Sequence, residues 1–181
     1  DASMKDQVLS DVATLGVSYS RPGEYSNFGV IVDSNPEQNY IWISDNTIDG
    51  AGIKINVQKI PKDFKIKEIN TIKTEQQMSD VVYRYFSVLS VEKISKDDIN
   101  DIKIEKIGSD KYITAIITPE SRKFVMKVAI LIRNNHMYGV SFADYVLQDK
   151  LKNILLFNSF MRSFKVKDLN QKTAYVGKTF S

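Results

Sequence analysis

The residue of this chain best suited to acid–base or metal chemistry is its single histidine, His136. It lies in Arg133-Asn-Asn-His136-Met137, where the paired asparagines predict a tight hairpin turn, because Asn tolerates the positive φ that such turns demand. We therefore expect a solvated turn residue, with partner binding or pH sensing as the alternative. One histidine without any cysteine does not predict a tight zinc site, and no Gly-x-Ser-x-Gly elbow supplies a serine for a triad that uses His136.

Carboxylates form one local cluster, in Ser95-Lys-Asp-Asp-Ile-Asn-Asp101. Its spacing is similar to that of oxygen-rich calcium loops, but the central Gly and terminal Glu of the EF-hand are missing, so the sequence predicts a solvated helix-to-strand loop. Gly50-Ala-Gly52 precedes a predicted strand, whereas nucleotide-binding glycine loops open a helix. The sequence thus predicts no catalytic residue, no cofactor and no metal, although carboxylates that only the fold brings together cannot be seen at this level.

Aromatic side chains are the other candidates, for binding and not for catalysis. Tyr40 and Trp42 alternate along Asn39-Tyr-Ile-Trp-Ile-Ser44 and so share one face of a predicted strand. If that face is covered they belong to the core, and if it is open they form a stacking or partner-binding platform. Tyr25, in the turn after Pro22 and Gly23, and His136 complete the set of candidate partner-binding residues.

Charge and composition are those of an ordinary globular protein, with 25 basic and 22 acidic residues and a formal net charge of +3. The lysines are scattered, whereas nucleic-acid binders usually concentrate positive charge on one face, so nucleic acid is not an expected partner. The densest run, Lys59 to Lys67, alternates with apolar residues and predicts a strand with a solvated outer face, or else phosphate or membrane-surface contact.

The sequence leaves the compartment open. Without cysteine there can be no disulfide or thiolate site, which is compatible with export. Asp1-Ala-Ser-Met4 fits the end left by signal-peptide removal, which predicts an extracytoplasmic protein, but a native start at Met4 would predict a cytoplasmic one. The longest apolar stretch, Phe124 to Ile132, is broken by Lys127 and falls far short of the ~20 residues that span a bilayer, so no transmembrane segment is expected.

Three segments have helical periodicity. Residues 4–15 predict a short helix that stops at Gly16. Thr74 to Leu89 is the strongest, because Thr74 and Gln77 form a capping box ahead of a wide apolar stripe. A final helix is expected from about Asp144 to Phe164, followed by a polar tail.

Between these segments the apolar residues alternate with a period of two, which predicts strands separated by turns. The short links between consecutive strands favour antiparallel pairing. The predicted strands are 28–32, 39–44, 53–57, 102–107, 112–118, 124–132 and 138–142, with 64–69 as a weaker strand or an extended connection.

The order of helix, strands, helix, strands, helix predicts an α+β fold in which helices cover an antiparallel sheet, an α/β/α sandwich. We expect an N-terminal helix at 1–16, one sandwich domain at 17–167 and a C-terminal tail at 168–181, since a chain of 181 residues fits a single domain comfortably.

This layout resembles the PsbP-like fold, which a photosystem oxygen-evolving subunit, a Ran-binding nuclear-import factor and many small bacterial exported proteins share. Three stretches carry the resemblance, which spans residues 17–166: the turn Tyr19-Ser-Arg-Pro-Gly-Glu-Tyr25, the hairpin Val128 to Phe142, and the helix end Leu156 to Val166. Members of this fold are mostly binding or assembly proteins, so the resemblance implies such a role here, and no family residues carry over.

We therefore predict a non-enzymatic, exported, bacterial binding or assembly module that contacts a protein partner. One alternative is a cytoplasmic adaptor or chaperone of the same fold, and the other is an enzyme that uses carboxylates or tyrosines gathered by the fold.

Overall fold

The computed structural model describes residues 16–19, 27–31, 38–44, 52–88, 93–120, 125–144 and 150–169. The predicted helix at 4–15, the candidate Tyr25 and the tail beyond Leu169 lie outside these residues. The domain boundaries therefore stay predictions.

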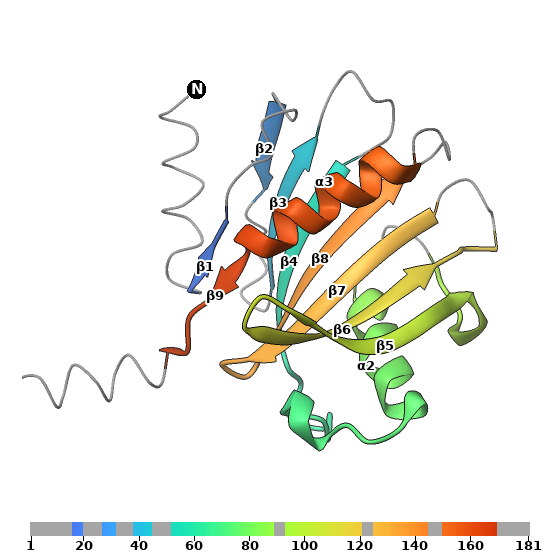
Figure 1. Ribbon diagram of the computed structural model, residues 1–181. Helices are drawn as coiled ribbons and strands as arrows, with labels where there is room; N and C mark the ends of the chain where they lie inside the picture. The colour runs from blue at the N-terminus through green and yellow to red at the C-terminus, as the bar shows by residue number, and fades with distance from the viewer. Residues whose placement is uncertain are drawn as a thin grey trace, which may run out of the picture.

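A seven-stranded antiparallel sheet forms the centre of the molecule (Figure 1). Its spatial order is β2-β3-β4-β8-β7-β6-β5, so that β4 and β8, far apart in the sequence, are neighbours in the middle of the sheet. The strands are β2 (Asn27–Ile31), β3 (Gln38–Ser44), β4 (Gly52–Lys59), β5 (Ile99–Ile107), β6 (Asp110–Ile117), β7 (Val125–Arg133) and β8 (His136–Asp144).

Two further strands, β1 (Val17–Ser18) and β9 (Lys165–Val166), pair with each other in a small separate sheet. Gly16 adopts a φ of 79°, a conformation that glycine reaches without strain, and its carbonyl accepts a hydrogen bond of 2.9 Å from the Lys167 amide. The chain before the large sheet is thereby tied to the chain after the last helix.

Helix α2 (Glu75–Ser87) begins as the sequence predicts. The Thr74 hydroxyl accepts from the Gln77 amide at 3.1 Å, and the Gln77 side chain accepts from the Thr74 amide at 3.0 Å, which completes the capping box. Its apolar stripe is buried against one face of the sheet at Val81, Val82, Tyr85 and Phe86.

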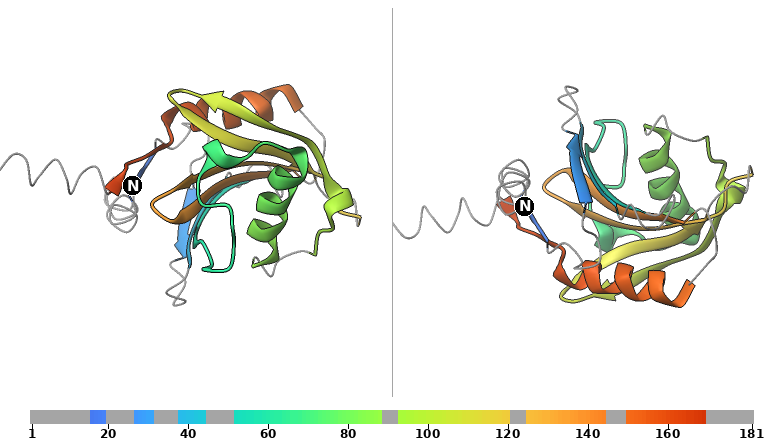
Figure 2. Two further views of the ribbon diagram at one scale, coloured as in Figure 1. Left: turned by 90° about the horizontal axis from the view of Figure 1, so that it is seen from below. Right: turned by 90° about the horizontal axis from the view of Figure 1, so that it is seen from above.

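Helix α3 (Lys150–Ser163) lies on the other face of the sheet, as Figure 2 shows. Phe157, Phe160, Met161 and Phe164 pack there against alternate residues of β4, β7 and β8. Each sheet face thus has its own apolar core and its own helix, which confirms the predicted α/β/α arrangement.

Several predicted boundaries were wrong. Asp144 is the last residue of β8 and not the start of the final helix, because the β7–β8 pairing runs its full length to Asp144 opposite Val125. Of the two alternatives for residues 64–69, the structure has the extended connection, at 64–68, ended by a short 3₁₀ turn η1 (Ile69–Thr71). In the carboxylate cluster, a 3₁₀ turn η2 (Lys96–Asp98) leads directly into β5, so Asp101 is a strand residue with a φ of 49° at a bulge.

Candidate partner-binding site

Strand register decides on which side of the sheet Tyr40 and Trp42 lie. Tyr40 pairs with Asn56 and Trp42 with Lys54, and directly opposed residues of neighbouring strands share a sheet face. Across the next strand, Lys54 pairs with Ser141 and Asn56 with Gly139. We call the residues of this row other than Gly139, together with Gln58, the polar strip; they are Tyr40, Trp42, Lys54, Asn56, Gln58 and Ser141.

The polar strip lies on the α2 side of the sheet, whereas the other residues of the same strand serve the α3 side. Ile53, Ile55 and Val57 of β4 are all buried in the core beneath α3. Lys54, Asn56 and Gln58 alternate with them and therefore face the opposite way. This sheet face is thus polar at Lys54, Asn56 and Gln58 of β4, and its apolar core includes Met137 of β8 and residues of β7 and β6.

Three side chains of the polar strip are nevertheless deeply buried: Asn56 at 1% exposure, and Gln58 and Ser141 at 5% each. Buried amides need partners, and Gln58 has one, because its Nε2 donates to the Tyr85 carbonyl at 2.8 Å. This bond fixes the C-terminal half of α2 to β4.

The footprint of α2 ends beside this strip. The helix packs on β5 and β6, and the Tyr85 ring lies against Gly139 so closely that a Cβ at residue 139 would overlap it. Gly139 is on β8, and the Tyr85 carbonyl reaches Gln58 of β4, so β3 is the next strand beyond these contacts.

His136 lies elsewhere, so the structure does not bring the candidate residues together. It is the first residue of β8 and not part of the turn itself, which Asn134 and Asn135 make with φ values of 55° and 60°. Its Nδ1 donates to the Asn134 carbonyl at 2.7 Å, and its strand partner is Lys59. His136 is partly buried at the end of the sheet where β5 and β7 finish.

The same end of the sheet holds the segment that follows α3. Asn134 Nδ2 donates to the Tyr138 hydroxyl at 3.0 Å and to the Lys167 carbonyl at 2.8 Å, while its Oδ1 accepts from the Leu169 amide at 2.9 Å. Arg133 donates to the Val166 carbonyl at 2.6 Å and pairs with Asp110 at 2.9 Å. These hydrogen bonds fix β9 and the residues that follow it to the β7–β8 hairpin.

Four exposed lysines surround this end, and sequence reasoning did not single them out as a group. Lys106 and Lys111 are directly opposed across the β5–β6 turn, and Lys165 Nζ lies beside Gly108 of that turn, 3.1 Å from the point where a Cβ would be. Lys59 ends β4 opposite His136. We call Lys59, Lys106, Lys111 and Lys165 the basic end. The available signal was the symmetric spacing of Lys106 and Lys111 about Gly108-Ser109.

Comparison with known proteins settles the fold and no more. No protein-family model and no curated protein sequence matches the chain. The solution structure of cyanobacterial PsbP from Synechocystis sp. PCC 6803 is similar with a TM-score of 0.54 and 9% identity, over 84% of this chain and 94% of that one. The fold is PsbP-like. A 1.50 Å crystal structure from Bacteroides thetaiotaomicron VPI-5482 aligns at a TM-score of 0.42 and 10% identity, over 86% of this chain and 46% of that one.

Two properties of the described residues bear on the kind of site. No three His, Cys, Asp or Glu side chains there gather closely enough to hold a metal ion. No helix there is both long and apolar enough to cross a bilayer.

Among the described residues of the sheet, Tyr112 has a strongly raised pKa. Burial raises the pKa of its phenol from 10.0 to about 12, the nearby Asp110 carboxylate adds to the rise, and Arg133 opposes it. Burial also raises the pKa of Tyr138, against the hydrogen bond from Asn134. Both phenols belong to the core under α3, so their perturbation reflects packing and not a reactive site.

We expect this burial to make the protein sensitive to alkali. The folded state holds the Tyr112 proton more tightly than the unfolded chain, so its contribution to stability is complete below pH 10 and is lost as pH rises toward 12. The free energy of unfolding should fall by about 2 kcal/mol over this range on account of Tyr112 alone. Urea titrations at several pH values measure it, with Tyr112→Phe as the control; an equal loss in that variant would contradict the assignment.

Proposed function

We propose that the chain is a non-enzymatic binding or assembly module that acts outside the cytoplasm and holds a protein partner with the polar strip. The PsbP-like fold is compatible with this role. Residue chemistry and register at β3 and β4 supply the more specific support.

The observation that carries the proposal is the register that places Tyr40 opposite Asn56 and Trp42 opposite Lys54. If Tyr40 and Trp42 had a purely structural role, we would expect them on the α3 side of the sheet. Ile53 and Ile55 lie on that side, in the core beneath α3. Lys54 is only partly buried, so solvent reaches the row that Trp42 occupies. Tyr and Trp are among the residues that most often dominate the binding energy of protein interfaces.

The functional groups of the polar strip also favour binding over catalysis. They are two amides, a serine hydroxyl, a phenol, an indole and one ammonium group. This set can donate and accept hydrogen bonds and can stack, but it offers no carboxylate or imidazole to move a proton near neutral pH. A protein partner that presents peptide groups and apolar side chains would match it.

Trp42 makes the proposal testable, because it is the only tryptophan of the chain. We expect its fluorescence in the free protein to be quenched efficiently by acrylamide, and to become protected when a stoichiometric partner, captured by cross-linking in the source organism, is added. Trp42→Ala should abolish capture and change the melting temperature by less than about 3 °C, as a residue outside a packed core does.

Ile55→Ala is the matched control, because Ile55 lies on the neighbouring strand but in the core beneath α3, at 1% exposure. It should lower stability by about 2–4 kcal/mol and leave capture by the folded fraction intact. If Trp42→Ala destabilises the protein as strongly as Ile55→Ala does, the aromatic pair is core and the proposal is wrong.

A further inference from the structure

We propose that the basic end binds an extended acidic segment of the partner protein. This proposal names the chemical class of the segment that is bound, and it rests on the proposed function because it takes the partner to be a protein. It uses Lys59, Lys106, Lys111 and Lys165, at the end of the sheet where the hairpins turn. Lys59 directly follows Gln58 of the polar strip, and the other three lysines lie on β5, β6 and β9.

The placement of Lys106 opposite Lys111 works against stability. Like charges that directly face each other on neighbouring strands repel, and the third ammonium group, Lys165 Nζ, lies at the same turn. Within the described residues, none of the four lysines has a carboxylate within 4.0 Å. A concentration of positive charge that the fold does not neutralise internally is suited to an external anion.

Two charged groups near the basic end, Asp110 and Arg133, already have partners within the fold. Asp110, the acidic residue at the β5–β6 turn, pairs with Arg133 at 2.9 Å, with only 15% of its side chain exposed. The guanidinium of Arg133 also donates to the Val166 carbonyl, so it is committed to holding β9. The Asp110 carboxylate therefore does not pair with the lysines of the basic end.

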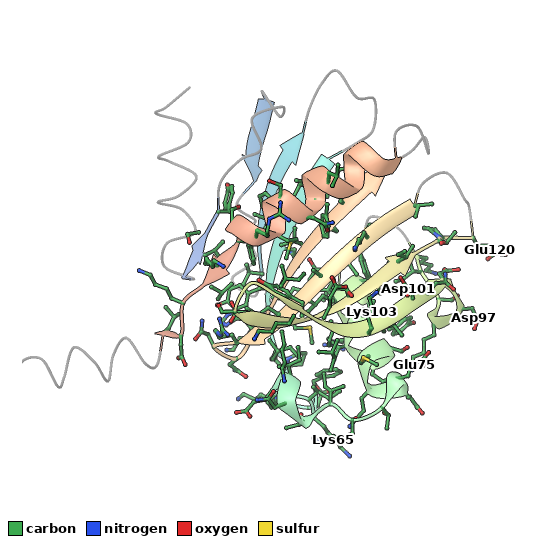
Figure 3. The ribbon with its side chains drawn as sticks, in the orientation of Figure 1. Lys65, Glu75, Asp97, Asp101, Lys103 and Glu120 are labelled. Atoms are coloured by element: carbon green, nitrogen blue, oxygen red, sulfur yellow. The ribbon has the colours of Figure 1, made fainter. Side chains whose placement is uncertain are left out.

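The opposite end of β5 and β6 carries acidic side chains. Asp97 and Asp101 precede or open β5, and Glu120 follows β6; Figure 3 labels all three at that end of the sheet. The lysines there have local partners, since Lys96 pairs with Asp80 at 2.7 Å and Lys103 lies 4.0 Å from Asp101. The basic end is thus a feature of one end of the fold and not of the whole surface.

The dimensions of the basic end fit an extended chain. From Lys59 on β4 to Lys106 on β5 the sheet crosses four strand spacings, or about 19 Å. About six residues in an extended conformation span this distance. Lys59 is in line with Val57 on the α3 side, whereas Lys111 is in line with Ile113 on the α2 side. A segment with several carboxylates would therefore lie along the strand ends, between the two faces, to contact lysines from β4 to β5.

Nucleic acid and membrane fit this surface less well. Single-stranded nucleic acid needs exposed aromatic rings between the cations, but Tyr112 and Tyr138 at this end are 1% and 0% exposed. A membrane surface needs several apolar side chains to insert, and of the large exposed apolar side chains of the described chain only Ile104 lies on a strand of the basic end. Tyr83 and Val88 lie on or beside α2, and Leu155 lies on α3.

The test uses the full chain and a fluorescein-labelled peptide of about eight residues in which Glu and Ser alternate. Polarisation at low ionic strength should show binding that weakens steeply as salt is added. In Lys106→Glu/Lys165→Glu we expect about ten-fold weaker binding, because two of the neighbouring cations become anions. This variant should stay folded, since the new carboxylate opposite Lys111 replaces a repulsive pair with an attractive one.

Lys73→Glu/Lys93→Glu is the matched control, because it makes the same change in net charge at two exposed lysines that flank α2. It should weaken peptide binding by less than about two-fold. An equal loss in both variants would overturn the inference, and so would oligothymidylate or phosphatidylserine vesicles that bind the wild type more tightly than the peptide does.

The two proposals fail in different ways. If the captured partner survives Lys106→Glu/Lys165→Glu but is lost with Trp42→Ala, the acidic-segment inference is wrong and the proposed function stands. If the wild-type chain captures no stoichiometric partner while the peptide binds as expected, the proposed function is wrong and the basic end remains an acidic-ligand site.

Discussion

Replacing Gly139 with alanine should lower the free energy of unfolding by about 3 kcal/mol or more, the upper range for overpacking a core. The added methyl group would overlap the Tyr85 ring at Cζ, Cε1 and the hydroxyl oxygen, all well under 3.0 Å. Neither side can yield easily, because Gly139 is in a central strand and Tyr85 is 1% exposed. Urea denaturation followed by circular dichroism measures the loss.

A double-mutant cycle identifies the cause. Tyr85→Leu shortens the side chain over Gly139, so in that background Gly139→Ala should lower stability by less than about 1 kcal/mol. An additive double variant would mean that the ring is not what excludes a side chain from position 139.

The second large effect is expected at Arg133. Arg133→Met should lower the free energy of unfolding by about 3 kcal/mol, because it leaves the largely buried Asp110 carboxylate without its counter-charge. The Val166 carbonyl loses its donor in the same step, so β9 should be released from the β7–β8 hairpin. Hydrogen exchange at residues 165–169 would report this release alongside the denaturation curve.

Two comparisons isolate the ion pair. Arg133→Met/Asp110→Asn should recover part of the lost stability, because the buried charge is then gone. Lys103→Met removes an exposed partner 4.0 Å from Asp101 and should change stability by less than about 0.5 kcal/mol. A double variant no more stable than Arg133→Met would show that the lost bond to Val166, and not the uncompensated carboxylate, is the main effect.

Local signals predicted most of the fold. Thr74 with Gln77 fixed the start of α2 to the residue, and Asn134 with Asn135 fixed the β7–β8 turn, because each signal depends only on neighbouring residues. The end of β8 was placed wrongly because Asp144 is held by its pairing with Val125, a contact that local periodicity does not contain.

The candidate site was less accessible to sequence reasoning. Alternation alone could say that Tyr40 and Trp42 share a face, but only the register with β4 says that Asn56 and Lys54 share it too. The basic end shows the same limit more clearly. Its lysines come from four different strands, so they look scattered along the chain and meet only where the strands end.

The pairing of β4 with β8 has a consequence for the chain during its synthesis. Asn56 meets Gly139, a residue made about 80 positions later. At about 5–20 residues per second, the ribosome needs several seconds to deliver that partner. Until then β4 presents open amides and carbonyls along one side, and Ile53, Ile55 and Val57 have no β8 to pack beside. The nascent chain therefore passes through a period in which the middle of its future sheet is an edge.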